Sequence, residues 1–362
     1  MTLRRALGPV LIASLLLAGP ASAAMLALPF PVPSVKASGS PATCGNRAPK
    51  AVVSLAVTSR YDQSDKTKST IDDDAEEAYQ QGMKPIRDYL ADVSQMATRY
   101  TESNGARVKE AACALAWMAA WAKSGALTDL DTRQAVLSST RIMAGLSISY
   151  AQVKNAHAGT PEDRALIDAW LQEFADLVKG NFSADGTDDR SSDRQNHRYW
   201  AGFSVAAIGV VTGDRDDLAW GFTSYKIGAC QIRADGVLPM ELARGKRARD
   251  YHIHATGPLV MIAELAAANG MDAYGACGGA IHRLVKFNLD MIRDPRTVEA
   301  MTGEKQLKIP TRSGAIRGDR VAWLAPYLKR FPQKRSVVAG IKLPERLTSS
   351  NLGGNLGTLF RL

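Results

Sequence analysis

The sequence predicts an all-α protein with minor or no β structure. Apolar residues recur at the three- and four-residue spacing of a helix face through most of the 362 residues. Short breaks marked by Gly, Asp or Pro separate the repeats of this pattern, and strand signals are weak. The segments predicted to be helical are 72–103, 109–127, 129–155, 161–180, 197–212, 215–234, 251–269, 272–293 and 318–330.

The first of these segments, 72–103, keeps its apolar spacing along its whole length, and Pro85 inside it either kinks one helix or starts a second. The next, 109–127, is rich in alanine, the strongest helix former, and Gly125 ends it. The remaining segments repeat the pattern in order, and the short links between them favour packing as antiparallel hairpins. Solenoids, helix bundles and α/α toroids all fit this series of helices.

Two stretches carry weak strand signals. They are AVVSLAV at 51–57 and the Gly-rich tail LGGNLGTLF at 352–360. We find no sequence repeat, and nothing indicates a second domain, so residues 44–362 are expected to form one domain.

The N-terminus reads as a secretory signal peptide over residues 1–23. Arg4 and Arg5 precede a short apolar stretch, and Ala-Ser-Ala at 21–23 is a small-residue cleavage site. The apolar run is too short to span a membrane, and no later segment is long and apolar enough to do so. We therefore expect an exported, periplasmic protein, and a poorly ordered leader over residues 24–43, which are rich in Pro, Ala and Ser.

The charge balance is basic. The chain carries 45 Lys and Arg against 36 Asp and Glu, a net charge of +9, and without Arg4 and Arg5 the balance is 43 − 36 = +7. A basic exported protein suits an acidic partner. Outside the cytoplasm, anionic polysaccharide and anionic lipid are better candidates than nucleic acid. A soluble surface with a basic bias is the alternative that composition leaves open, and we expect a monomer.

Four cysteines are spread along the chain without a CxxC pair: Cys44, Cys113, Cys230 and Cys277. This spacing does not suit a zinc site. In an oxidising compartment an even number of cysteines favours two disulfides, with buried free thiols as the alternative.

Two polar clusters interrupt the helical pattern, RQNHRYW at 194–200 and ELARGKRARDYHIHATGPL at 241–259. In a helix, Arg244, Arg247 and Tyr251 would share one face because they are three and four residues apart. Guanidinium groups beside a phenol lower its pKa and suit it to proton transfer. On spacing alone, however, a basic solvated face with Tyr251 packed at its edge is the favoured interpretation.

The two clusters resemble motifs of the alginate lyases of polysaccharide lyase family 5, periplasmic enzymes that cut polymannuronate. In that family Asn-His-x-Tyr-Trp begins an inner helix, and Glu-Leu, Arg and Tyr-His follow later in the chain. The matching positions here are Asn196, His197, Tyr199, Trp200, Glu241, Leu242, Arg244, Tyr251 and His252. The resemblance extends to YDQSDKTKSTID at 61–72, ACALAWMAAWAKSGAL at 112–127, AWLAPY at 322–327 and the tail, so it spans nearly all of the mature chain.

The resemblance implies an incomplete α/α toroid with a deep cleft, and β-elimination that leaves an unsaturated uronate end. A uronate C5 proton lies α to a carboxylate, so the developing negative charge must be stabilised. By motif match, Asn196 and Arg244 neutralise that carboxylate, and His197 is either a further neutraliser or a second base. Tyr251 would remove the C5 proton and protonate O4, which lie on the same face of mannuronate.

The resemblance also implies substrate-binding positions, at Tyr61, Lys66, Arg198, Tyr199, Trp200, Arg247, His252 and His254. Residues 59–70, which combine cations with Tyr61 and lack apolar periodicity, are predicted to form a mobile lid over the cleft. Trp200 is expected to offer a stacking surface. Tyr199 is at least as well explained by packing that supports the helix.

Two departures from the family pattern leave the preferred polymer open. Gln195 stands where the family often has Asn, and Ile253-His254-Ala255 stands where it typically has Asn-Tyr-Ala. Mannuronate-rich alginate is the favoured substrate. Polyglucuronate, or another glucuronate-containing polymer, is the alternative, because glucuronate differs from mannuronate only at C2.

No metal or other cofactor is expected. His252 and His254 are two residues apart and face different ways on a helix, and no acidic or cysteine cluster completes a ligand set. Non-enzymatic alternatives are a polyanion-binding protein, against which the complete catalytic set argues, and an anionic-lipid binder, for which no amphipathic basic helix is evident. Sequence order and the family-like positions of Cys44 and Cys113 predict disulfides Cys44–Cys113 and Cys230–Cys277.

Overall fold

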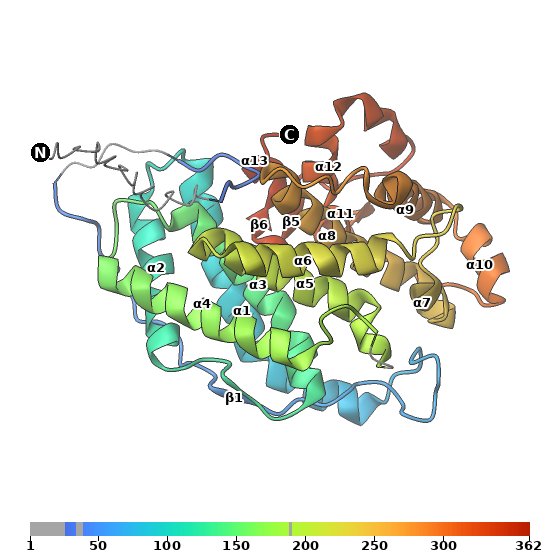
Figure 1. Ribbon diagram of the computed structural model, residues 1–362, viewed down its shortest axis with the longest axis horizontal. Helices are drawn as coiled ribbons and strands as arrows, with labels where there is room; N and C mark the ends of the chain where they lie inside the picture. The colour runs from blue at the N-terminus through green and yellow to red at the C-terminus, as the bar shows by residue number, and fades with distance from the viewer. Residues whose placement is uncertain (1–25, 34–38, 188–189) are drawn as a thin grey trace, which may run out of the picture.

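The computed structural model describes residues 26–33, 39–187 and 190–362, and the signal peptide expected at 1–23 lies outside them. The described chain is mostly helical, and its β structure consists of two-stranded pairs (Figure 1). The α-helices are α1 (Asp73–Glu102), α2 (Val108–Lys123), α3 (Arg133–Val153), α4 (Pro161–Asn181), α5 (Asn196–Thr212), α6 (Arg215–Ala229), α7 (Pro239–Leu242), α8 (Ala248–Ala268), α9 (Ala276–Arg293), α10 (Arg296–Thr302), α11 (Gly318–Val321), α12 (Leu324–Arg330) and α13 (Leu356–Leu359). Short 3₁₀ helices are η1 (Ser191–Asp193), η2 (Gly245–Arg247), η3 (Pro332–Val338) and η4 (Ser350–Leu352).

The strands are short. They are β1 (Ser54–Leu55), β2 (Asp129–Leu130), β3 (Thr311–Arg312), β4 (Ala315–Ile316), β5 (Thr348–Ser349) and β6 (Gly354–Asn355). β1 pairs with β2 in parallel, and β3–β4 and β5–β6 are antiparallel. The two predicted strand segments are therefore wrong for most of their residues: only two residues of each find a partner strand, and the tail continues into α13.

The all-α prediction is confirmed, and the architecture is an α/α toroid. Every segment predicted to be helical contains an α-helix, and Pro85 lies inside the single helix α1. Four helices, α1, α3, α5 and α8, pack side by side in chain order. Each of them also packs against the helix that follows it along the chain, α2, α4, α6 or α9, and α4 and α6 are the long helices at the front of Figure 1. No helix in the described part of the chain is long and apolar enough to span a membrane.

The N-termini of these helices are capped in different ways. The side-chain oxygens of Asp72, Thr132 and Thr160 accept backbone N–H groups in the first turns of α1, α3 and α4. Gln195 at the start of α5 makes no such bond. At α5 the first N–H is satisfied by a carboxylate from a distant segment, which makes this helix start part of the site described below.

Residues 26–33 correct one part of the prediction of a poorly ordered leader over residues 24–43. Leu26 and Phe30 are buried in the main core, and the Phe30 ring packs edge-on against Phe360 with ring centroids 5.5 Å apart. The Ala27 N–H also donates to the Asn269 side chain at 2.8 Å. Residues 26–33 are therefore part of the fold, because burying two large apolar side chains outweighs the entropy of a free segment.

Both predicted disulfides are confirmed. Cys44 is bonded to Cys113, with Cα atoms 4.6 Å apart, and Cys230 is bonded to Cys277, with Cα atoms 5.2 Å apart. The first joins the segment before β1 to α2, and the second joins the end of α6 to the start of α9. The first therefore ties the N-terminal segment to a helix, and the second ties together two different helix pairs.

Removing the first disulfide is expected to destabilise the fold strongly. It closes a loop of 69 residues, and the chain-entropy description gives about 4 kcal/mol for loops of this length. We expect Cys44→Ser/Cys113→Ser to lower the free energy of unfolding by a comparable amount, measured by urea unfolding beside the wild type. Full reduction of the wild type is the control, and an unchanged midpoint in the double variant would contradict the prediction.

Candidate active site

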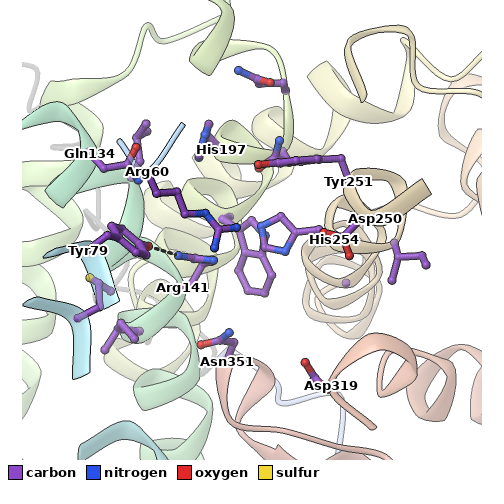
Figure 2. Close-up of a pocket in the computed structure, with 18 of the residues that line it drawn as sticks. Arg60, Tyr79, Gln134, Arg141, His197, Asp250, Tyr251, His254, Asp319 and Asn351 are labelled. Atoms are coloured by element: carbon purple, nitrogen blue, oxygen red, sulfur yellow. Dashed lines mark hydrogen bonds between the residues drawn. The ribbon is translucent and has the colours of Figure 1, made fainter. Parts of the chain in front are cut away.

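A cavity of ≈ 370 Å³ opens among the N-terminal halves of the inner helices. Its walls come from the loop before α1 and from α1, α3, α5, α8, α11 and η4. In Figure 2, Arg60, Arg141, His197, Tyr251 and His254 project into the same space from these different elements. The toroid therefore gathers side chains from almost the whole chain at one end of its inner helices.

Tyr251, in the first turn of α8, has two close partners in the cavity. The Arg244 guanidinium lies over its ring, with Cζ 3.5 Å from the ring centroid. The hydroxyl of Tyr61 is 2.5 Å from the hydroxyl of Tyr251. Arg60 Nη2 donates to that Tyr61 oxygen at 3.1 Å. The Tyr61 oxygen thus has a donor, and its own proton is free to be donated to Tyr251.

The pKa of Tyr251 is raised, contrary to the sequence-based prediction. Burial is the largest cause, and Tyr61 acts in the same direction. The positive charges of Arg244 and Arg60 oppose the rise. The prediction was wrong because it counted the cations and not the loss of hydration of the phenolate.

The loop 59–70, the predicted lid, is organised around one carboxylate. Asp65 accepts hydrogen bonds from the backbone and hydroxyl groups of Thr67 and Ser69 and from the backbone of Thr70. These bonds lower the pKa of Asp65 well below its ordinary value. Lys66, predicted to bind substrate, is exposed and does not line the cavity.

The carbonyl groups of this loop are held by two arginines. Arg244 donates from Nε to Thr67 O at 2.8 Å and from Nη2 to Lys68 O at 2.6 Å. Arg247 donates from Nε to Ser69 O at 2.8 Å. Of the two, only Arg244 also lines the cavity and touches Tyr251, because residues 245–247 form a 3₁₀ turn and not a continuous α-helical face. Arg247 therefore holds the loop and does not face the cavity.

His197, the second residue of α5, is neutral at neutral pH. Burial lowers its pKa to about 3, and the charges of Arg141, Arg244 and Arg133 act in the same direction. A neutral imidazole can accept a proton but brings no positive charge. Of the two roles that the motif left open, the role of second base therefore suits His197 better than that of cationic neutraliser.

Trp200 and His254 form part of the cavity wall. Their rings are 5.2 Å apart, and the Tyr251 ring meets His254 edge-on at 6.2 Å. Burial and then the charge of Arg141 hold the pKa of His254 well below its ordinary value. Both residues stand where the sequence expected substrate contacts, and that role stays a prediction.

Asn196 begins α5 and is bound to Glu241 of α7. The Glu241 carboxylate accepts the Asn196 backbone N–H at 2.7 Å and the Asn196 side-chain amide at 3.2 and 3.1 Å. Both side chains are fully buried, and Asn196 lines the cavity. Glu241 is the carboxylate that replaces a local N-cap of α5.

Arg198 does not line the cavity, which contradicts its predicted position as a substrate contact. Its guanidinium is fully buried, donating to Ser224 Oγ at 2.8 Å and to Ala184 O at 3.1 Å, with Cζ 4.1 Å from the Trp220 ring. Successive residues of an α-helix point roughly 100° apart, so the side chain that follows His197 faces α6 and not the cavity.

Tyr199 and His252 are also structural, which corrects two more predicted substrate contacts. The buried Tyr199 hydroxyl donates to Arg194 O at 3.1 Å. His252 accepts the Leu238 N–H at 3.0 Å through Nε2, and its Nδ1 lies 2.8 Å from Ala248 O. Neither side chain lines the cavity. Both motif residues hold the segments that carry their reactive neighbours.

Several cavity residues on other helices lie outside both sequence motifs and were not predicted. Arg141 of α3 donates to the Tyr79 hydroxyl of α1 at 2.9 Å, and Arg320 of α11 pairs with Asp250 at 2.5 Å. Figure 2 shows the Arg141–Tyr79 bond beside the centre of the cavity. Arg141 carried a signal, because it is a cation in the middle of a helix whose other residues from Ala135 to Val153 are all buried.

Metal chemistry has no support among the described residues, where no group of three or more His, Cys, Asp or Glu side chains could hold an ion. The chemistry open to the cavity is proton transfer by Tyr251 or His197 beside the Arg244 charge and the Asn196 amide. These are the functional groups that proton abstraction next to a carboxylate requires.

Known proteins resemble this chain in both sequence and fold. The family description "Alginate lyase" matches residues 56–298. An alginate lyase of Pseudomonas paraeruginosa is 33% identical over 89% of this chain and 86% of its own length, and one of Cobetia marina is 30% identical over 99% and 96%. The crystal structure of alginate lyase A1-III from Sphingomonas species A1 superposes with a TM-score of 0.72 at 21% identity, covering 89% of this chain and 85% of that one. A variant of A1-III complexed with a tetrasaccharide gives the same TM-score.

Proposed function

This chain belongs to the alginate lyase family, and from that premise we propose that it is a periplasmic lyase that cleaves mannuronate-rich alginate by β-elimination. The proposal rests above all on Tyr251, whose hydroxyl reaches the cavity with the Arg244 guanidinium against its ring. Relatives of this family that bind oligosaccharide support a polysaccharide substrate. The basic n-region and small-residue cleavage site at 1–23 support export.

In the proposed reaction Tyr251 removes the C5 proton of the sugar. The phenolate must form first, with its proton passing to solvent, and it is stabilised by the positive charges of Arg244 and Arg60, which act to lower the pKa of Tyr251. As the C5–H bond breaks, charge grows on the sugar carboxylate, where Arg244 and Asn196 stabilise it. The C4–O4 bond then breaks, and the protonated Tyr251 gives its proton to O4. A phenol whose pKa is raised by burial holds that proton until the leaving oxygen requires it.

The experiment that tests the proposal is an activity panel. Purified protein is mixed with polymannuronate, polyguluronate, polyglucuronate and hyaluronan, and the ultraviolet absorbance of the new C4=C5 double bond is followed. We expect the highest kcat/KM on polymannuronate. A preference for polyglucuronate would move the substrate to the glucuronate alternative, which His254 and Gln195 leave open. No absorbance change on any polymer would overturn the lyase proposal.

The lid is expected to contribute to substrate affinity through Asp65. Asp65→Ala removes the acceptor that turns three loop carbonyls toward Arg244 and Arg247. We therefore expect KM for long polymer to rise about tenfold, which corresponds to about 1.4 kcal/mol of lost hydrogen bonding. Asp62→Ala is the matched control, because the Asp62 carboxylate accepts from the backbone and hydroxyl of Ser64 in the same loop and not from the segment 67–70. Equal KM values for the two variants would show that the loop is an ordinary solvated turn.

Binding is expected to weaken with salt. Cations outnumber carboxylates on the cavity wall, with Arg60, Lys68, Arg87, Arg141, Arg244 and Arg320 against Asp250 and Asp319. The Debye length is about 10 Å at 0.1 M salt, so partly exposed pairs with a polyuronate are screened. We expect KM to rise steeply with sodium chloride while kcat at saturation changes little, with sucrose of matched osmolality as the control. A flat KM would contradict this.

A further inference from the structure

Glu241 is a buried carboxylate whose hydrogen bonds all go to one residue. It accepts the backbone N–H of Asn196 and the Asn196 amide, and it is fully buried. Within residues 26–33, 39–187 and 190–362, no cation lies at salt-bridge distance from it. A fully buried carboxylate without a paired cation is costly as an anion unless hydrogen bonds compensate it.

The Asn196 side chain also has a polar atom whose hydrogen bonding is not satisfied. Its amide nitrogen is engaged with Glu241, and its side-chain oxygen Oδ1 is buried without a hydrogen-bond partner. The proposed function instead requires this side chain to donate to a sugar carboxylate in the cavity that it lines. An Asn whose nitrogen faces one carboxylate is poorly arranged to receive a second one, because its free end is an acceptor.

We propose that Glu241 is a positioning residue that takes up a proton when the substrate carboxylate binds, and thereby turns the Asn196 amide so that its N–H groups face the substrate. The inference deepens the proposed function and rests on it. The protonated Glu241 donates its O–H to Asn196 Oδ1, and its other oxygen keeps accepting the Asn196 backbone N–H. The proton comes from solvent and returns to solvent when product leaves, and no covalent bond other than the O–H of Glu241 changes.

The surroundings of Glu241 make this proton uptake accessible near neutral pH. Burial raises the pKa of Glu241 to about 7, while the bonds from Asn196 and the charge of Arg244 act in the lowering direction. The other titratable group that faces Glu241 is Tyr199 of α5, whose pKa is itself raised well above its ordinary value, so it stays uncharged. A substrate carboxylate beside Asn196 adds a second negative charge, which raises the pKa of Glu241 further.

The pH dependence follows in sign. Above about pH 7 the free protein holds Glu241 ionised, so binding requires proton uptake, and the affinity of Tyr251→Phe for a polymannuronate oligosaccharide is expected to fall about tenfold for each pH unit in that range. Below that pH the proton is already present and the dependence disappears. Glu241→Gln keeps a donor for Asn196 Oδ1 and an acceptor for its backbone N–H at every pH, so this variant is expected to lose the alkaline fall. Glu241→Ala keeps neither the donor nor the acceptor, so we do not expect it to behave like Glu241→Gln.

The direct test is calorimetry of a polymannuronate oligosaccharide binding to Tyr251→Phe, in two buffers of different ionisation enthalpy at about pH 8. We expect net proton uptake that approaches one per bound oligosaccharide, and its loss in Tyr251→Phe/Glu241→Gln. Absence of uptake with Glu241 in place overturns the inference whether or not the Gln variant folds, and so does equal uptake in both proteins. Wild-type turnover of polymannuronate without proton uptake would leave the proposed function standing and remove only the role of Glu241.

Discussion

Tyr251→Phe is expected to abolish eliminative turnover while polymer binding survives. The substitution removes only the hydroxyl, so the ring stays beneath the Arg244 guanidinium and edge-on to His254. Loss of a proton-transfer group lowers the rate by about 10²–10⁴ or more. Because both proton abstraction and O4 protonation are assigned to this one hydroxyl, we expect the loss at the upper end of that range.

The measurement is kcat from the absorbance of unsaturated product, beside the dissociation constant of an oligosaccharide. Tyr225→Phe is the matched control. Its hydroxyl is buried, donates to Ala273 O at 2.6 Å and does not reach the cavity. Losing that bond costs about 1 kcal/mol of stability and leaves turnover intact. If Tyr251→Phe retained most of the wild-type kcat, His197 would be the better candidate for the base.

The fold could be predicted from the sequence because its signals are local. Helical periodicity and the Gly, Asp and Pro breaks located the helices between α1 and α12 other than the short α7 and α10, and four widely spaced cysteines were compatible with both disulfides. The segment 26–33 could not be predicted in this way. Its order comes from Phe30 meeting Phe360, a contact between the two ends of the chain that no local pattern contains.

The candidate site could be predicted only where its residues are close in sequence. The motifs brought Asn196, His197, Arg244 and Tyr251 to attention together, and all four line the cavity. Neighbours within a motif were misleading, because Arg198 follows His197 in the chain but faces α6.

Arg141 illustrates the opposite case, a cavity residue that the sequence motifs did not indicate. It lies far from both motifs in the sequence and reaches the cavity from α3, since the toroid brings every inner helix to one cleft. The prediction of a lowered pKa for Tyr251 failed for a related reason. The spacing of the arginines can be seen in the sequence, but the burial that raises this pKa is a property of the tertiary structure.

Arg244→Ala is expected to lower kcat by about 10²–10³, the usual effect of removing one group that stabilises developing negative charge. Arg244 has two functions in the structure: its guanidinium covers the Tyr251 ring, and it holds the lid through Thr67 O and Lys68 O. The first acts on the transition state and should appear in kcat. The second acts on substrate binding and should appear in KM.

Arg247→Ala separates these two functions of Arg244. Arg247 holds the same loop through Ser69 O but does not line the cavity, so we expect its loss to raise KM with a much smaller change in kcat. Steady-state kinetics of both variants on polymannuronate make the comparison. Arg244→Lys tests whether the two parallel N–H donors of the guanidinium are needed, because lysine keeps the positive charge but cannot donate to both loop carbonyls in this way. If Arg244→Ala and Arg247→Ala changed kcat and KM alike, Arg244 would act through the lid alone, and stabilisation of the sugar carboxylate would fall to Asn196.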